Sequence, residues 1–227
     1  MILKKEGRRN VAVACKITAD IFKKLIFELK KHSFETEADI FRWLRKETYK
    51  QGCNLAFWPV IATAKNGYEI HHKPNETKLK KGFLVVDFGV KYKGFCADCT
   101  RTIYLGKPSK GEVKLYNLVL MAQKSALQEV KTGAYAADID AVARAALADY
   151  LFSFVHSAGH GVGKKVHKAP RVSPRSKSVL KEGDIIAVEP GLYFKDKFGI
   201  RIEDTVLVGK KAIILTKITK DLIFIKR

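Results

Sequence analysis

Residues 83–105 read FLVVDFGVKYKGFCADCTRTIYL, in which two runs rich in β-branched and aromatic residues flank the polar tetrapeptide KYKG. This pattern predicts a β-hairpin. With Tyr92 and Lys93 as the two-residue loop, Asp87 lies directly opposite Asp98, with Cβ atoms about 4.5–5.5 Å apart. Two carboxylates at this distance repel each other, so the pair predicts a bound cation or a shared proton.

Helices and further strands are expected on both sides of this hairpin. Apolar residues at helical spacing, bounded by capping residues and glycines, predict helices over residues 18–31, 36–52, 109–133 and 138–150. The β-rich runs cover residues 83–87, 95–104, 185–189 and 200–208. Because two helices followed by strands occur twice, we expect an α+β domain with two related halves around a mainly antiparallel sheet.

Length and composition indicate one domain without a membrane span. The 227 residues contain no Ser/Gly-rich linker, so we expect a single domain over residues 1–227 with no separate N-terminal domain. The longest apolar run, Leu55–Ala62, contains Pro59 and is far shorter than the ~20 residues of a transmembrane helix. The N-terminus also lacks an apolar stretch long enough for a signal peptide. We therefore expect a cytoplasmic protein.

The four cysteines are predicted to be free thiols. Cys15, Cys53, Cys96 and Cys99 are irregularly spaced, unlike a disulfide framework. Positions 96 and 99 of a strand point to opposite faces, so the Cys96-x-x-Cys99 motif is not expected to chelate one metal ion. Cys96 shares a face with Asp98, which makes its thiol a candidate for oxidation or for binding soft metals.

The chain is strongly basic, with 43 Lys and Arg against 23 Asp and Glu and a net charge of +20. Such a field attracts nucleic acid or anionic peptides. The basic residues occur as scattered doublets, however, without a helix-turn-helix, zinc-finger or aromatic RNA-binding signature. We interpret the charge as a solvated surface and do not expect nucleic acid as the main partner.

A second pair of acids lies in the C-terminal β-rich region. Glu189 ends one strand before Pro190, and Glu203 lies within the apolar run GIRIEDTVLV. Strand alternation places Arg201 and Glu203 on one face and Asp204 on the other. A buried carboxylate needs a cation or an ion pair, so Glu203 is either a metal ligand or the partner of Arg201 in a structural ion pair.

Three of the six histidines fall in the glycine-rich segment 154–172, FVHSAGHGVGKKVHKAPRV. They are His156, His160 and His167, and the glycines between them let the backbone approach a ligand closely. Four carboxylates and an imidazole form an oxygen-rich donor set that suits Mn²⁺, Co²⁺ or Fe²⁺ and is able to hold Zn²⁺. Two such ions would activate a water and polarise a carbonyl, which indicates amide hydrolysis.

At this point the chain resembles a known family. The segments VVDFG, GFCADCTRT, HSAGHGVGKKVH, VEPGLYF and GIRIEDTVLV are similar, in order and spacing, to those of the pita-bread metallopeptidases. That family comprises methionine aminopeptidases, Xaa-Pro aminopeptidases and prolidases. The resemblance implies a pita-bread fold, a peptide substrate and two divalent metal ions, with Mn²⁺ or Co²⁺ first and Fe²⁺ or Zn²⁺ as alternatives. It leaves both a monomer and a homodimer open.

The resemblance also implies roles for individual residues. Asp87 would bind one ion, Asp98 and Glu203 would bridge both, and His160 and Glu189 would complete the shell of the second ion. Glu189 would also transfer the proton during attack on the first peptide carbonyl.

Four further residues are implied to contact the substrate: His71, His156, His167 and Arg201. Of these, His71 is the substrate-side histidine and His167 steadies the tetrahedral intermediate. His71 is followed by His72, which leaves a one-residue alternative. We place the role on His71, because its spacing to Gly82 is similar to that of the Xaa-Pro enzymes.

The motifs are consistent with three functions. The segments RIED and TRT resemble Xaa-Pro aminopeptidases and prolidases, which makes an Xaa-Pro exopeptidase the first hypothesis. A methionine aminopeptidase is the alternative, since the chain begins almost directly with the catalytic region. A non-catalytic pita-bread protein that binds protein or nucleic acid is less favoured, because such proteins usually lose metal ligands. In the plainest reading, the acids and histidines form only structural ion pairs.

Overall fold

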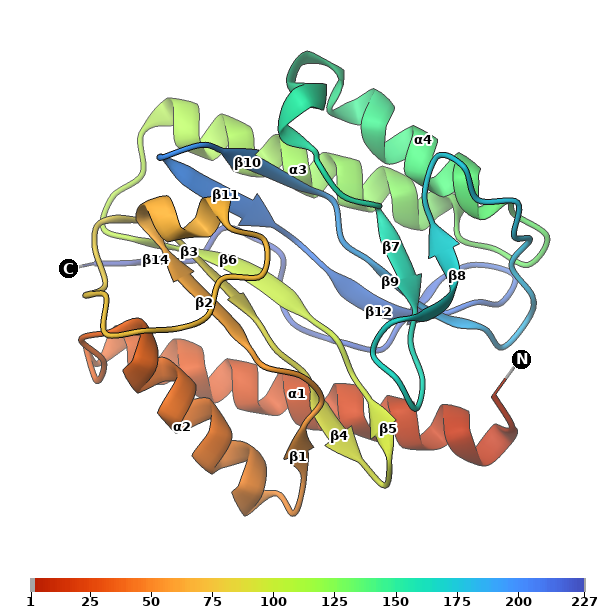
Figure 1. Ribbon diagram of the computed structural model, residues 1–227, viewed down its shortest axis with the longest axis horizontal. Coiled ribbons are helices and arrows are strands. Elements are labelled where there is room, and N and C mark those ends of the chain that lie inside the picture. Colours follow the sequence, from red (N-terminus) through yellow and green to blue (C-terminus); the bar gives the residue numbers. More distant parts are fainter. Residues whose placement is uncertain (1–2, 227) are drawn as a thin grey trace.

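The computed structural model describes residues 3–226 and places its strands between two pairs of helices (Figure 1). Helices α1 (Lys5–Lys30) and α2 (Glu37–Lys50) lie on one side of the strands. Helices α3 (Lys110–Glu129) and α4 (Ala136–Ala146) lie on the other side. The two helix pairs follow each other in the chain with strands after each pair, as expected from the sequence.

Two helices begin where the sequence predicts, because capping boxes fix their first turns. The Thr36 side chain accepts from the backbone N–H of Asp39 at the start of α2, and Ser109 does the same for Glu112 at the start of α3. In each box the acidic side chain accepts from the backbone N–H of the capping residue in return. Capping residues of this kind stabilise a helix by about 1 kcal/mol each.

The other two helices differ from the prediction. Helix α1 begins at Lys5 instead of residue 18, because buried residues such as Val11 and Ala14 continue its apolar face toward the N-terminus. Helix α4 ends at Ala146, and the next residues form the 3₁₀-helix η2 (Ala148–Ser153). No helix within residues 3–226 is both long and apolar enough to span a membrane.

The strands form two larger and two smaller sheets. One larger sheet has the order β13 (Ile213–Ile214), β12 (Asp204–Leu207), β9 (Ile185–Val188), β7 (Gly159–Gly161) and β8 (Lys168–Val172). The other has the order β14 (Phe224–Ile225), β6 (Thr100–Leu105), β3 (Gly82–Asp87) and β2 (Val60–Thr63). The smaller sheets contain β1 (Asn54–Leu55), β4 (Val90–Tyr92) and β5 (Phe95–Cys96), and β10 (Gly191–Phe194) with β11 (Phe198–Arg201). Among these strands only β14 and β6 pair in parallel, so the mainly antiparallel α+β prediction is confirmed.

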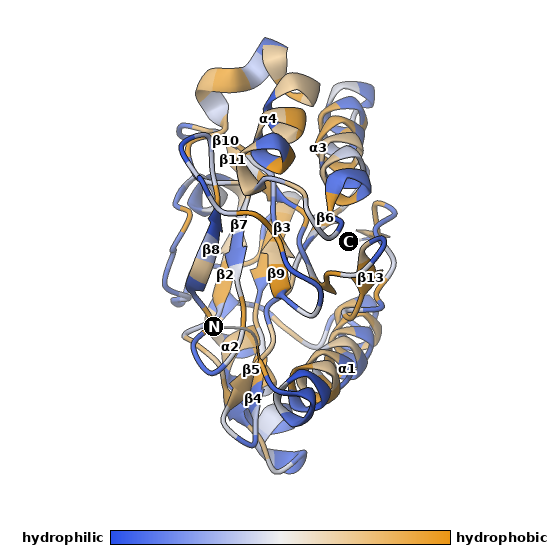
Figure 2. Cartoon of the chain, turned by 90° about the vertical axis from the view of Figure 1, so that its right-hand side faces the viewer, coloured by the Kyte–Doolittle hydropathy of each residue, from blue (hydrophilic) through white to orange (hydrophobic). Residues whose placement is uncertain are grey.

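The strands bury alternate residues in two hydrophobic clusters. In β9, Ile185 and Ala187 belong to the cluster that contains residues of α1 and α2. Ile186 and Val188 belong to the cluster that contains residues of α3 and α4. Side chains along a strand alternate between faces, so the helix pairs cover opposite faces of the strands (Figure 2). The polar residues of the candidate site therefore lie mainly where the strands end or are interrupted.

The hairpin register differs from the prediction. The two-residue loop is Lys93–Gly94, whereas the prediction used Tyr92–Lys93. Both loop residues have positive φ, 46° and 81°, as a type I′ turn requires, and glycine adopts this conformation more easily than a tyrosine or lysine. Moving the loop by one residue shifts the pairing by two, so Asp87 pairs with Thr100 and not with Asp98.

Two predicted strands are each broken at an acidic residue. The run 95–104 is interrupted at residues 97–99, which contain Asp98, and the run 200–208 is interrupted at residues 202–203, which contain Glu203. The backbone N–H of Glu203 donates to the carbonyl of Thr100 over 3.1 Å, so the two breaks lie against each other. The breaks bring both acids to one place in the interior.

Candidate metal centre

The five predicted metal ligands come together from five different segments. Asp87 ends β3, His160 lies in β7 and Glu189 follows β9, while Asp98 and Glu203 occupy the two strand breaks. Their oxygen and nitrogen atoms, together with a ring nitrogen of His167, form overlapping groups in which all ligand atoms lie within 4.8 Å of one another. Within each group, distances of this size let one cation reach every member.

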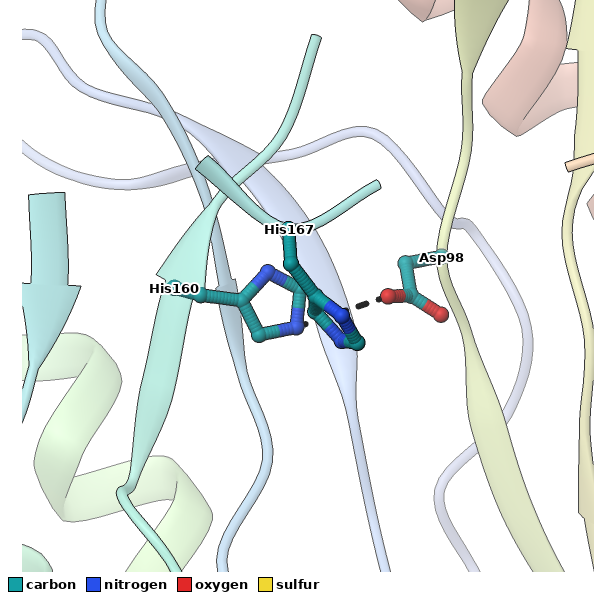
Figure 3. A group of neighbouring side chains, drawn as sticks. All are labelled: Asp98, His160 and His167. Carbon is teal, nitrogen blue, oxygen red and sulfur yellow. Dashed lines mark ion pairs between the residues drawn. The ribbon is translucent and has the colours of Figure 1, made fainter. Parts of the chain in front are cut away.

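His160 presents a lone pair to the carboxylates. Its Nδ1 lies 3.2 Å from the carbonyl oxygen of Gly161, to which it donates when the proton is on that nitrogen. Its Nε2 lies 3.5 Å from Asp98 Oδ2 (Figure 3) and 3.4 Å from Glu189 Oε1. Burial and the nearby His167 lower the pKa of His160 to about 4. At neutral pH the ring is therefore uncharged, in the form that binds metals.

Two carboxylate oxygens in the cluster are buried without a hydrogen-bond partner among residues 3–226. They are Asp87 Oδ1 and Glu203 Oε1. The second oxygen of each group is satisfied, since Asp87 Oδ2 accepts from Arg201 and Glu203 Oε2 accepts from the Thr100 hydroxyl. A buried polar atom without a partner is costly, and a divalent cation between these oxygens satisfies both, so the residues fit a metal centre.

Burial and mutual repulsion raise the pKa values of acids in the cluster. Burial, together with the charges of Glu203 and Asp87, raises the pKa of Asp98 far above its ordinary value. Burial and the charges of Glu189 and Asp87 do the same for Glu203. Burial raises the pKa of Glu189 to about 8. A bound cation reverses this effect, because it stabilises the ionised carboxylates.

Arg201 is buried behind the cluster and holds it together. Its Nη2 donates to Asp87 Oδ2 over 2.7 Å, its Nη1 to the Tyr193 hydroxyl over 2.8 Å and its Nε to the Thr100 hydroxyl over 3.1 Å. Arg201 also lines the pocket described below, but these donors are directed at residues of the site. The pairing of Arg201 with Glu203 that the sequence left open is not seen, since the partner is Asp87.

The predicted substrate-side histidines line the same pocket but differ in their burial and hydrogen bonds. His156 has both ring nitrogens engaged, Nδ1 with the carbonyl of Ser157 and Nε2 with the Tyr193 hydroxyl, each at 2.8 Å. Burial and then the charge of Arg201 lower the pKa of His156 to about 3. His167 is exposed, and its ring packs edge-to-face on His160 with centroids 4.3 Å apart (Figure 3).

The neighbouring residues His71 and His72 differ sharply. His71 is exposed and lines the pocket. His72 is buried and its Nε2 lies 2.7 Å from Glu37 Oε2. Of the two, only His71 has a ring without a hydrogen bond to residues 3–226, and its assignment as the substrate-side histidine stays a prediction.

The cluster forms the floor of a pocket of about 840 Å³. A pocket of this size accommodates a ligand of a few residues. The pocket is also lined by three histidines, His71, His156 and His167. Apolar residues line it as well: Phe57, Trp58, Val60 and Ile70. The pocket therefore combines a polar region at the acids with an apolar region at the aromatic residues.

Residues 9–210 match the model of metallopeptidase family M24. The chain belongs to this family. The M24 assignment covers all five candidate ligands and all four predicted substrate-side residues. It agrees with the site, because carboxylates and a histidine that converge on a pocket are what a metallopeptidase requires.

Other proteins of this kind share much of the M24 chain. It is 40% identical to a protein of Mycoplasma genitalium over 207 residues. This aligned stretch covers 87% of the M24 chain but only 58% of the relative. It is 41% identical to the Xaa-Pro dipeptidase of Pyrococcus horikoshii over 172 residues. This aligned stretch covers 74% of the M24 chain and 49% of that enzyme. The chain therefore spans about half to three-fifths of the length of these relatives.

Solved structures confirm the pita-bread fold. The Xaa-Pro dipeptidase of Bacillus anthracis superposes with a TM-score of 0.91 at 32% identity, over 98% of this chain and 64% of that one. Dipeptidase PepE of Mycobacterium ulcerans gives a TM-score of 0.94 at 29% identity, over 100% of this chain and 62% of that one. The folds agree over almost the whole M24 chain.

Sequence reasoning missed two residues that support the site. Thr100 donates its hydroxyl to Glu203 and accepts from Arg201, and Tyr193 connects Arg201 to His156. Both lie inside quoted segments, TRT and GLYF. The sequence placed them next to metal ligands, but only the register of β6 and β10 shows that their hydroxyls point toward the cluster.

Proposed function

We propose that this M24 chain carries the catalytic site of a dinuclear metal-dependent exopeptidase that hydrolyses the first peptide bond of peptides with proline in the second position. The observation that carries the proposal is the ligand cluster itself. Five candidate ligands converge on the floor of an open pocket, and two of their buried oxygens have no hydrogen-bond partner within residues 3–226.

The metal chemistry follows from the donor set. Four carboxylates and one imidazole favour Mn²⁺ or Co²⁺, with Fe²⁺ or Zn²⁺ as alternatives. Asp87, Asp98, Glu203, His160 and Glu189 would hold the ions. The chemistry that such ions supply is the activation of a water molecule and the polarisation of the scissile carbonyl.

The remaining steps belong to the side chains of the chain. Glu189 lies in the cluster with its Oε1 3.4 Å from Nε2 of His160, so its carboxyl group is placed to take up a proton and release it to the leaving amine. His167 is exposed as a residue, but its ring packs on His160, and this partial desolvation lowers its pKa, so a neutral ring offers one N–H to an oxygen that gains negative charge. His71, which also lines the pocket, orients the substrate.

The substrate class is supported by sequence motifs and by relatives. RIED and TRT resemble the Xaa-Pro enzymes, and the Pyrococcus horikoshii and Bacillus anthracis proteins described above are named Xaa-Pro dipeptidases. A further solved structure, the X-Pro aminopeptidase of Thermotoga maritima, has a TM-score of 0.91 at 31% identity. A dipeptide and a longer peptide with proline second are therefore both substrates to be tried.

The test compares peptides on protein loaded with Mn²⁺ or Co²⁺. We expect release of the first residue from Xaa-Pro dipeptides or Xaa-Pro tripeptides and none from a Met-Ala-containing peptide. Cleavage of the Met-Ala peptide alone would instead identify a methionine aminopeptidase. No release from either peptide, with metal bound, would refute catalysis and leave a binding protein.

A further inference from the structure

A carboxylate that belongs to no predicted site lies completely buried at the start of helix α2. Glu37 has an exposed fraction of 0%. Its Oε1 accepts from the backbone N–H of Thr63 over 2.8 Å and from the Asn66 side chain over 3.0 Å. Its Oε2 lies 2.7 Å from Nε2 of His72. A buried charge is retained only where it is fully paired, and the hydrogen-bond partners of the Glu37 side chain, residues 63, 66 and 72, all lie in the segment that leads to the pocket wall.

His72 is the other half of this arrangement. It is 7% exposed, and its Nδ1 lies 3.2 Å from Glu69 Oε2. Both ring nitrogens thus face carboxylates. The hydrogen bond to Glu37 raises the pKa of His72 against the opposing effect of burial, so the ring favours the charged form that donates from both nitrogens.

The segment on either side of His72 forms part of the pocket. Ile70, His71 and Lys73 all line it. Within residues 3–226 the His71 ring has no hydrogen bond of its own, so its position depends on the backbone that carries it. That backbone is anchored one residue further on, through His72 to Glu37.

Helix α2 also fixes the chain after His72. The backbone N–H of Glu37 donates to the carbonyl of Thr77, and that of Ala38 donates to the carbonyl of Asn75. These bonds hold the later part of the segment, while the Glu37 side chain holds the part next to His71. The side chain of Glu37 is therefore the contact that acts directly on the pocket wall.

We propose that Glu37 and His72 form a buried tether that positions His71 against the substrate, which makes both of them positioning residues for the reaction. The proposal rests on the proposed function, because His71 is there assigned to orienting the peptide. It adds a residue that lies far in sequence from every motif of the metal centre. Glu37 does not line the pocket, and its contact nearest to His71 along the chain is the one with His72.

The first test is the Glu37→Gln variant of the full chain, assayed with an Xaa-Pro peptide and Mn²⁺. Gln keeps the shape of the side chain but removes the charge opposite His72. We expect kcat/KM to fall by ~10- to 100-fold, since small displacements of a positioning group have effects of this size. Bound metal per chain is expected to stay at the wild-type value, because Glu37 is not a ligand. An active variant with wild-type kcat/KM would overturn the proposal.

A matched control comes from the same segment. Glu76 is exposed and forms a salt bridge with Arg42 over 2.9 Å. Exposed ion pairs contribute little to stability, so Glu76→Gln is expected to keep wild-type kcat/KM.

The second test separates positioning from general damage. Glu37→Gln is introduced into a His71→Ala background, and residual kcat/KM is compared with that of His71→Ala alone. If Glu37 acts through His71, the second substitution causes no further loss. The same fold-loss in both backgrounds would show that Glu37 supports the fold in general, and would contradict the proposal.

The third test does not depend on catalysis. Hydrogen–deuterium exchange is followed over residues 69–73, where the N–H of His72 donates to the carbonyl of Glu69. Faster exchange in Glu37→Gln than in Glu76→Gln is expected, and equal exchange would refute the tether even if the wild-type chain cleaves no peptide. Should Glu37→Gln not fold, the Glu37→Gln/His72→Gln double variant replaces the charges by two amides and is judged by the same exchange.

Discussion

Arg201 Nη2 donates to Asp87 Oδ2 over 2.7 Å, and the other oxygen of Asp87 is left buried with no hydrogen-bond partner within residues 3–226. The guanidinium is 2% exposed and also binds Thr100 and Tyr193. One arginine thus fixes the orientation of a metal-ligand candidate and leaves its free oxygen directed at the cluster. Residues that orient ligands in this way influence metal affinity strongly.

The Arg201→Lys substitution tests this relationship. Lysine keeps the positive charge but lacks the planar fork that reaches three partners at once. We expect affinity for Mn²⁺, measured by titration calorimetry, to fall by ~10- to 100-fold. Arg42→Lys, at an exposed arginine, is the control. Equal affinity in wild type and Arg201→Lys would show that Asp87 is oriented by other contacts.

The Tyr193→Phe substitution tests the connection to His156. It removes the hydroxyl that binds His156 Nε2 and Arg201 Nη1 and leaves both groups buried without that partner. Such a loss costs about 1–3 kcal/mol, and urea unfolding of the variant is expected to show a destabilisation in this range. A variant as stable as the wild type would mean that water replaces the hydroxyl.

His72 predicts a pH dependence of stability. Its pKa in the folded state is raised by Glu37, so its contribution is fully present below the unfolded-state pKa of about 6.5 and is lost as pH rises through the folded-state value. The difference in unfolding free energy between wild type and His72→Gln is therefore expected to be larger near about pH 6 than near about pH 9. A difference that grows with pH would contradict the assigned charge state.

The four cysteines are predicted to be unreactive in the folded protein. All four are buried and free, and burial raises the pKa of each thiol. Reaction requires an exposed thiolate, so a thiol reagent is expected to label the chain only after unfolding. Rapid labelling of Cys96 in the native state, with loss of activity, would instead support the oxidation sensitivity considered from the sequence.

The sequence singled out the acids and the histidine that the structure brings together, but it did not predict their geometry. Acids and histidines in apolar or glycine-rich segments are chemically conspicuous, and Asp87, Asp98 and Glu203 could be selected for that reason. The hairpin register was wrong, because the choice between two adjacent loops depends on small differences in turn energy. The strand breaks that bring Asp98 and Glu203 together depend on contacts between segments far apart in sequence, which no local pattern reveals.

The roles of the supporting residues Glu37 and Tyr193 could not be predicted from the sequence for a related reason. Glu37 was not singled out from the sequence, because its contact is with His72, 35 positions away. Tyr193 appeared as one aromatic residue in a short strand. Long-range hydrogen bonds of this kind are set by tertiary packing, so they become visible only in the structure.

The most direct test of the account is a Mn²⁺ titration in which bound metal and cleavage of an Xaa-Pro peptide are measured on the same samples. Cleavage is expected to appear as metal binds, to be lost with a chelator, and to fall by ~100-fold or more in Asp98→Asn, together with weaker metal binding. Metal bound at the cluster without cleavage of any Xaa-Pro peptide, or cleavage that Asp98→Asn leaves unchanged, would contradict it.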